Sequence, residues 1–288
     1  MRCKKINLMD AYPFLGEDGC MPVLNTYLPD NLSEMHRGNQ RRPAILICPG
    51  GGYGMCSQRE AEPVALHYLH KGYNVFILWY SVAPHCFPQQ IREVAAAVDL
   101  IHRNAESWNC DENHVAIMGF SAGGHLAAHY STSFDCREVR SVFPESYPVA
   151  ASILCYPVIT ADPAYTHMGS IENVSGHKPI MPEDVKRFSC ELLVTEKTPP
   201  AYIWHTAEDP WVPVHNSFLY ARALSEKNIP FELHVFPFGA HGLATCDEQT
   251  NDGEITERTA HNQSWIEESQ QWLKLLWENH GLENVSSQ

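Results

Sequence analysis

Short apolar runs recur along this chain, and segments with helical periodicity separate them. The predicted strands are Ala44–Cys48, Tyr73–Trp79, His114–Met118, Ala150–Cys155, Ala201–His205 and Phe231–Phe236. The predicted helices are Gln58–Lys71, Ile91–Asn104, Ala122–Ser131, Val214–Lys227 and His261–His280. Strands that alternate with helices are joined by crossovers, which produce a parallel sheet with helices on both faces. The alternation therefore predicts an α/β fold with a mostly parallel central sheet.

Two segments depart from this alternation. The extended run Met21–Leu28 and the polar connection Asn31–Arg42 predict that residues 1–43 form an antiparallel N-terminal edge. Residues 160–200 form a small irregular insertion after the sixth-strand region. A lid and an elaborated surface loop with one short helix are both open interpretations of it. We expect residues 1–288 to form a single domain, because this length suits one large α/β domain.

The charge balance limits the partners of the protein. The formal net charge is −14, and such a surface repels nucleic acid and anionic membranes, so we expect neither as a partner. The sequence shows neither a signal-peptide pattern nor an apolar run long enough to span a membrane, which favours a cytoplasmic location. The ten cysteines include no C-x-x-C pair, which is typical of reduced thiols. Whether the protein forms a homo-oligomer stays an open question at this point.

The sharpest motif is Gly119-Phe120-Ser121-Ala122-Gly123, a G-x-S-x-G pattern between a predicted strand and a predicted helix. A serine hydroxyl is a weak nucleophile, and a tight strand-to-helix turn lets it project toward a base. Glycines on both sides permit the strained backbone of such a turn. Ser121 is therefore the candidate nucleophile. The alternative is a turn serine that only caps the helix.

A glycine-rich loop, Pro49-Gly50-Gly51-Gly52-Tyr53, follows the strand Ala44–Cys48. Successive glycines leave backbone N–H groups unshielded, which suits an oxyanion hole. The predicted donors are the N–H groups of Gly51, Gly52 and Ala122. A phosphate-binding loop is the alternative, but the chain lacks both G-x-G-x-x-G and the P-loop ending at this loop.

An acidic residue and a histidine complete a possible catalytic set. Asp209 follows the strand Ala201–His205, where a carboxylate can orient a histidine and stabilise its imidazolium form. Glu208 is the rival carboxylate, and either residue could instead cap the next helix. His241 lies in a glycine-flanked loop after the last predicted strand and is the best placed of the 16 histidines to serve as base.

Two further predictions concern ligands. His125 and His129 are four residues apart on a helix and could mimic a metal pair, but H-E-x-x-H is missing, so we expect neither a metal nor another cofactor. Five aromatic residues adjoin the candidate loops and are predicted to form an apolar or sugar-stacking wall, with plain packing as the alternative: Tyr53, Phe87, Tyr156, Trp211 and Phe238.

The chain order Ser121, Asp209, His241 is that of the α/β-hydrolases, and the sequence resembles the esterase and lipase branch of that superfamily. It is similar to the hormone-sensitive-lipase-like carboxylesterases and, more closely, to the bacterial acetyl-xylan-esterase-like members. Trp79–Pro88 resembles the tyrosine-to-proline segment of this esterase and lipase branch, and Arg59–Ala65 and Thr198–Pro200 resemble the bacterial acetyl-xylan-esterase-like members. Pro49 and Phe120 stand where the lipase-like group usually has a histidine and an acidic residue, which favours the sugar-esterase side.

The resemblance implies the α/β-hydrolase fold and a serine esterase without a cofactor. Its substrates would be small short-chain esters, acetyl esters above all, of carbohydrates such as acetylated xylo-oligosaccharides. A general carboxylesterase and an arylformamidase-type amidase use the same groups and stay open. A peptidase related to prolyl oligopeptidases would need a propeller domain, for which this chain has no room. The non-enzyme alternative is a catalytically dead hydrolase that serves as a binding module.

Overall fold

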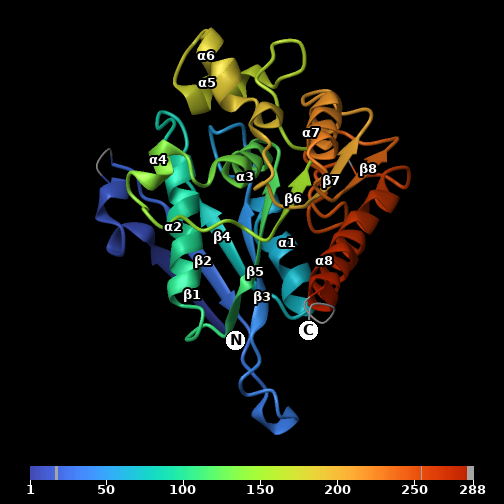
Figure 1. Cartoon of the computed structure of the whole chain (residues 1–288). Helices are drawn as coiled ribbons and strands as arrows, with labels where there is room; N and C mark the ends of the chain where they lie inside the picture. The colour runs from blue at the N-terminus through green and yellow to red at the C-terminus, as the bar shows by residue number, and fades with distance from the viewer. Residues whose placement is uncertain (17–18, 254, 284–288) are drawn as a thin grey trace.

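Within residues 1–16, 19–253 and 255–283, which the computed structural model describes, eight strands form one sheet (Figure 1). Their order is β1-β2-β4-β3-β5-β6-β7-β8. Their bounds are β1 Arg2–Asn7, β2 Val23–Leu28, β3 Arg42–Cys48, β4 Asn74–Trp79, β5 Cys110–Phe120, β6 Ala151–Cys155, β7 Ala201–Thr206 and β8 Phe231–Phe236. The predicted domain range 1–288 includes residues 17–18, 254 and 284–288, which lie outside the described residues.

The strands from β3 to β8 run parallel to one another, whereas β1 pairs with β2 and β2 pairs with β4 in antiparallel register. The mostly parallel sheet is therefore confirmed, and β1 and β2 form its antiparallel part. The sequence prediction missed β1, which lies outside β2. Four of the six residues of β1 are exposed, so the strand lacks the apolar pattern by which a strand is recognised.

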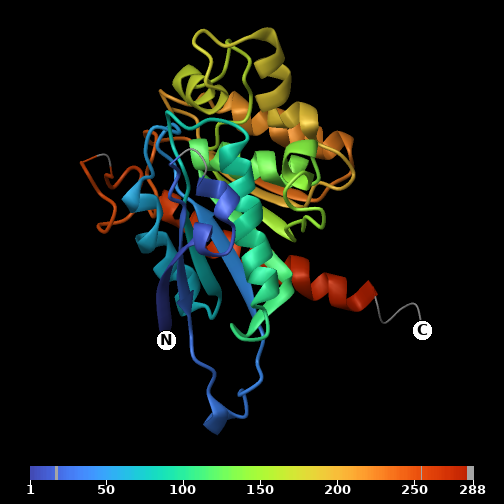
Figure 2. The same cartoon turned by 90° about the vertical axis from the view of Figure 1, so that its left-hand side faces the viewer.

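Each face of the sheet carries its own apolar cluster and its own helices. Leu46 of β3 packs into one cluster, while Ile45 and Ile47 pack into the other, because successive strand side chains point to opposite faces. The helices on the Ile45 side are α1 Glu62–His70 and α8 Ser264–Glu283. The helices on the Leu46 side are α2 Gln89–Arg103, α3 Ala122–Ser133 and α7 His215–Glu226. In Figure 1, α2 and α8 lie on opposite sides of the sheet, and in Figure 2 the side that carries α2 faces the viewer.

The predicted helices differ from the observed ones mainly at their starts. The predicted helix Gln58–Lys71 divides into a 3-10 turn and α1, which begins at Glu62 with a proline in its first turn. Gly72, at a φ of 90° that favours glycine, follows the end of α1. The 3-10 helices are Leu8–Asp10, Pro13–Gly16, Ser33–Met35, Gln58–Glu60, Cys190–Leu193 and Ala260–Gln263.

No helix within the described ranges combines the length and the apolar character needed to cross a membrane.

The insertion is more regular than predicted. It contains α5 Met168–Ser175, α6 Pro182–Phe188 and the 3-10 helix Cys190–Leu193, whereas α4 Arg137–Arg140 precedes β6. In Figure 1, α5 and α6 lie at the top of the molecule, above α3, and the connection between β2 and β3 projects at the opposite end. Val174 and Phe188 are buried in the core on the α2 and α3 side. The insertion therefore packs against the body of the protein.

Candidate active site

Ser121 occupies the turn between β5 and α3. Its backbone has a φ of 53° and a ψ of −119°, a conformation that costs energy for a residue with a side chain. The Ser121 N–H donates to Cys155 O at 3.0 Å, and the Ser121 carbonyl accepts from Val158 N–H at 3.1 Å. These bonds hold the strained turn in place.

The two glycines of the serine motif are required by close backbone contacts. A Cβ atom at Gly119 would lie 2.1 Å from Gly123 O, and one at Gly123 would lie 2.1 Å from Cys48 O. Both separations are far too short for any side chain. The motif therefore brings the start of α3 against the end of β3, where the glycine-rich loop begins.

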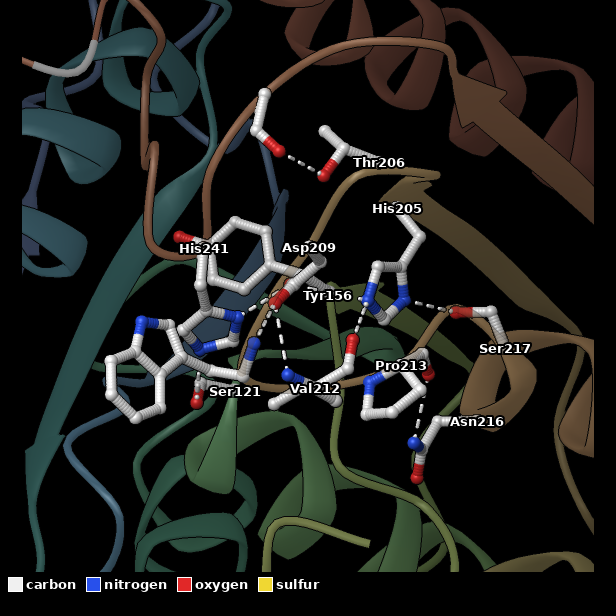
Figure 3. Close-up of polar contacts among 12 residues, drawn as sticks. Ser121, Tyr156, His205, Thr206, Asp209, Val212, Pro213, Asn216, Ser217 and His241 are labelled. Carbon is white, nitrogen blue, oxygen red and sulfur yellow. Dashed lines mark hydrogen bonds and ion pairs between the residues drawn. The ribbon is translucent and has the colours of Figure 1, made fainter. Parts of the chain in front are cut away.

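A chain of hydrogen bonds links the three candidate catalytic residues (Figure 3). Ser121 Oγ lies 2.8 Å from His241 Nε2, and His241 Nδ1 lies 2.6 Å from Asp209 Oδ2. The carboxylate can only accept, so Nδ1 carries a proton and Nε2 of a neutral ring is free to accept from the serine. Glu208 points elsewhere, because it is half exposed and pairs with Arg258. The structure thus brings together the three residues predicted from the sequence, with Asp209 rather than its rival.

Asp209 is held as an anion by its surroundings. Its Oδ1 accepts from the N–H groups of Trp211 and Val212, both at 2.9 Å. Burial raises the pKa of Asp209, but hydrogen bonds from His205 and His241 and the charge of His241 outweigh burial and lower it well below its usual range. Asp209 is therefore a carboxylate anion at neutral pH.

His205 is a second histidine beside Asp209 that sequence reasoning missed. It is fully buried, and its Nε2 lies 2.9 Å from Val212 O and 3.3 Å from Asp209 Oδ2. Because a carbonyl only accepts, Nε2 carries the proton, and Nδ1 accepts from Ser217 at 2.7 Å. His205 orients the carboxylate from the side opposite His241, as Figure 3 shows.

The glycine-rich loop lies against Ser121. A Cβ atom at Gly50 would lie 2.9 Å from Ser121 Cβ, and Gly51 and Gly52 have φ angles of 121° and 63°. Gly51, Gly52, Ser121 and His241 all line one cavity of about 300 Å³. Within the described ranges, no protein acceptor bonds the N–H groups of Gly51, Gly52 or Ala122. These donors are therefore available to an oxyanion, and their role stays a prediction.

Glu60 is a further residue at the site that sequence reasoning missed. It is buried, and its carboxylate accepts from Gly50 N–H and from the Tyr156 hydroxyl, each at 2.8 Å. The Tyr156 oxygen in turn accepts from Ala244 N–H at 3.0 Å. Burial raises the pKa of Glu60, although its hydrogen bonds and the charge of His241 oppose the rise. Glu60 and Tyr156 thus join the glycine-rich loop to the loop that carries His241.

The segment Trp79–Pro88 supports the glycine-rich loop from behind. The Tyr80 hydroxyl donates to Pro49 O at 2.6 Å, and Ala83 N–H donates to Tyr53 O at 2.7 Å. Glu93 holds this segment, because Ser81 donates to it from its N–H at 2.7 Å and from its hydroxyl at 2.5 Å. Burial raises the pKa of Glu93 to about 7.

Glu93 predicts a specific pH dependence of stability. Its pKa rises from 4.5 to about 7 in the folded protein, so between these values the native state retains a proton that the unfolded chain has lost. The wild-type free energy of unfolding should therefore fall, relative to that of Glu93→Gln, by about 3 kcal/mol as the pH rises through this window. Urea denaturation of both proteins across the window measures the difference. A difference that does not change with pH would contradict the assignment.

The predicted aromatic wall is wrong for four of its five members. Tyr53 and Tyr156 are at most 1% exposed, because their hydroxyls bond to His125 and Glu60 inside the protein. Phe87 packs on His129 and lines a different cavity. The Arg258 guanidinium covers the ring of Phe238 at 3.6 Å, and Phe238 does not line the Ser121 cavity. Sequence proximity to a loop did not reveal the direction of these side chains.

Trp211 is the one predicted aromatic residue that lines the Ser121 cavity, and it is 66% exposed. Two residues that sequence reasoning did not single out, Arg59 and His167, also line it. His167 comes from the insertion, where the sequence carried no pattern that pointed to the site.

The histidine pair of α3 has structural partners. His125 Nε2 donates to Phe188 O at 2.8 Å, and His125 Nδ1 accepts from the Tyr53 hydroxyl at 2.8 Å. Burial lowers the pKa of His125 to about 4 and that of His129 to about 3. Both ring nitrogens of His125 are therefore engaged within the protein. The described residues contain no group of three or more His, Cys, Asp or Glu side chains that could hold a metal ion.

Residues 24–224 match the model of the BD-FAE family. This chain belongs to the BD-FAE family. It is 38% identical over 237 residues to endo-1,4-beta-xylanase B of Butyrivibrio fibrisolvens, a match that covers 79% of this chain and 36% of that protein. It is 33% identical over 233 residues to acetylxylan esterase of Xylanibacter ruminicola, which covers 80% and 45%. The BD-FAE chain thus spans less than half the length of these curated relatives.

Solved structures resemble this BD-FAE protein over almost its whole length. The acetyl ester-xyloside bifunctional hydrolase from Caldicellulosiruptor lactoaceticus is 34% identical with a TM-score of 0.77, over 93% of this chain and 96% of that one. MGS-M1, an alpha/beta hydrolase enzyme from a deep-sea metagenome library, is 32% identical with a TM-score of 0.76, over 96% and 98%. The predicted α/β-hydrolase fold and the resemblance to esterases of that superfamily are therefore confirmed.

Proposed function

We propose that this BD-FAE protein is a serine ester hydrolase that removes short acyl groups, chiefly acetyl, from carbohydrate esters such as acetylated xylo-oligosaccharides. The observation that carries the proposal is the hydrogen-bond chain from Ser121 through His241 to Asp209, which begins at a cavity lined by Gly51 and Gly52. The acyl group and the sugar are supported by the names of two similar proteins, an acetylxylan esterase and an acetyl ester-xyloside hydrolase.

The geometry supports an acyl-serine mechanism. His241 Nε2 removes the proton of Ser121 as Oγ attacks the ester carbonyl, and the N–H groups of Gly51, Gly52 and Ala122 bind the resulting oxyanion. His241 then gives its proton to the leaving alcohol, and water activated by His241 releases the acid from the acyl-serine. Asp209 keeps the proton on Nδ1 and stabilises the imidazolium. Each oxyanion donor in such a site is worth about 3 kcal/mol of barrier.

We further propose that the chain forms one catalytic domain and that the insertion is a fixed wall of the site rather than a lid. Asn173 of α5 donates to Gly52 O at 2.8 Å, and Phe87 N–H donates to Val174 O at 2.8 Å. These bonds join the insertion to the glycine-rich loop and to the segment behind it, so opening would break contacts at the oxyanion site itself.

The test of the function is acetate release from acetylated xylo-oligosaccharides, beside hydrolysis of p-nitrophenyl esters from acetyl to octanoyl, by wild type and Ser121→Ala. Release from sugars that depends on Ser121 and prefers acetyl supports the proposal. Activity on longer simple esters alone would indicate a general carboxylesterase, and faster cleavage of N-formyl arylamines an arylformamidase. If folded wild type hydrolyses none of these substrates in a way that depends on Ser121, the result would favour a catalytically dead hydrolase that serves as a binding module.

Trp211→Ala tests recognition of the sugar. The exposed indole at the cavity offers a flat apolar surface. Burial of part of it against a sugar ring should stabilise the bound substrate by about 1 kcal/mol, or roughly fivefold in kcat/KM. We expect that loss on acetylated xylo-oligosaccharides and little change on p-nitrophenyl acetate. Phe231→Ala is the matched control, because this exposed ring begins β8, at the end of the parallel strands opposite to the one that Trp211 follows. Unchanged discrimination between the two substrates in Trp211→Ala would remove its assigned role.

A further inference from the structure

His167 places a third imidazole at the Ser121 cavity. It directly precedes α5 and lines the cavity of about 300 Å³ with Ser121 and His241. Its Cε1 lies 3.8 Å from the point where a Cβ atom at Gly52 would be. The ring therefore stands beside the glycine-rich loop, on the wall of the cavity that the insertion provides.

The protein itself sets the orientation of this ring. His167 Nδ1 lies 2.8 Å from the hydroxyl of Ser170, which is fully buried. Asn173, on the same helix, donates to Gly52 O at 2.8 Å and fixes the position of α5. With Nδ1 engaged, Nε2 is the nitrogen left for a ligand, and in the described part of the chain no protein group bonds to it.

The surroundings of His167 favour its neutral form. Burial lowers the pKa of His167, the nearby charge of His241 lowers it further, and Asp209 opposes both. A neutral imidazole has one donor and one acceptor nitrogen, so with Nδ1 engaged it offers a single hydrogen bond through Nε2. Such a group suits a hydroxyl better than a carboxylate or a phosphate, which call for cationic partners.

We propose that His167 Nε2 binds a free hydroxyl on the carbon next to the ester oxygen, so that the site favours esters of vicinal diols over esters of simple alcohols. Partly acetylated sugars are esters of this kind. A bond to the neighbouring hydroxyl also turns the ester oxygen toward His241, which must protonate it. The inference rests on the proposed function, because it needs acyl transfer at Ser121, and it adds the chemical class of the alcohol.

The test compares two acetates that differ by one hydroxyl, trans-2-hydroxycyclohexyl acetate and cyclohexyl acetate. We expect wild type to prefer the hydroxy ester in kcat/KM by roughly threefold to tenfold, the contribution of one neutral hydrogen bond. His167→Leu should bring this ratio close to one, because only the hydroxy ester loses a hydrogen bond. His167→Gln, which keeps a polar group, should retain part of the preference. His215→Phe is the matched control, because His215 stacks on Tyr165 of the insertion but does not line the cavity.

The outcomes separate this inference from the function on which it rests. A preference that survives in His167→Leu, or an equal loss on both esters, would overturn the role of His167 while Ser121-dependent hydrolysis of cyclohexyl acetate still supports the esterase. Hydrolysis of neither ester by folded wild type would overturn both. A second measurement needs no variant: trans-1,2-cyclohexanediol should inhibit wild type roughly threefold to tenfold more strongly than cyclohexanol. Equal inhibition would also count against His167.

Discussion

Replacing Ser121 with alanine is expected to lower kcat for ester hydrolysis by about 10⁵- to 10⁶-fold. The hydroxyl is the only group at the end of the hydrogen-bond chain that can form an acyl intermediate, and His241 lies 2.8 Å from its oxygen. The glycine N–H groups and the cavity remain in the variant, so a residual rate above that of water should persist. Initial rates on p-nitrophenyl acetate, with the variant prepared apart from wild type, measure the loss.

Ser131→Ala is the matched control for this variant. Ser131 lies on α3, the helix that Ser121 precedes, and its buried hydroxyl has no hydrogen-bond partner in the described part of the chain. Its removal should leave kcat within about twofold of wild type, because no bond is lost. A Ser121→Ala protein that kept a tenth or more of wild-type kcat would contradict the assignment of Ser121.

Replacing Asp209 with asparagine is expected to lower kcat by about 10⁴-fold with little change in the fold. Oδ1 accepts from two backbone N–H groups, so the amide oxygen of asparagine should take that position and its NH₂ group should face His241. The NH₂ group then donates to Nδ1, which moves the ring proton to Nε2. In that tautomer Nε2 cannot accept the proton of Ser121.

Glu208→Gln is the control for Asp209→Asn. Glu208 is the neighbouring carboxylate, but it is half exposed and pairs with Arg258 outside the hydrogen-bond chain. We expect its kcat/KM on p-nitrophenyl acetate to stay within about twofold of wild type, because surface ion pairs contribute little. Equal losses in the two variants would show that the region, rather than the Asp209 carboxylate, matters for the rate.

The sheet could be predicted where its strands are buried on both faces. β3 to β7 are short apolar runs because helices cover them on both sides, and such runs stand out in the sequence. β1 could not be predicted, because its lysines are exposed and it exists as a strand only through pairing with β2. The helices of the insertion could not be predicted, since they have only eight and seven residues, too few for a helical period to stand out.

The sequence motifs of the candidate site could be predicted, but the residues that hold these motifs in place could not. The serine motif, the glycine-rich loop and the order of Asp209 and His241 are readable because each follows a strand that ends at the same edge. Glu60, His205 and His167 reach the site through tertiary packing, and nothing in their neighbouring residues signals it. The buried tyrosines Tyr53 and Tyr156 show the converse error, because their position was predicted correctly and the direction of their side chains was not.

The most direct test of the central claim is to identify the residue that becomes covalently modified when activity is lost. Wild type would be treated with diisopropyl fluorophosphate, hydrolysis of p-nitrophenyl acetate would be followed in time, and the adduct would be located by peptide mass spectrometry. We predict one adduct per chain, on Ser121, that accumulates in step with the loss of activity and is absent in Ser121→Ala. Complete inactivation with the adduct on another residue, or full activity after complete modification of Ser121, would contradict the account.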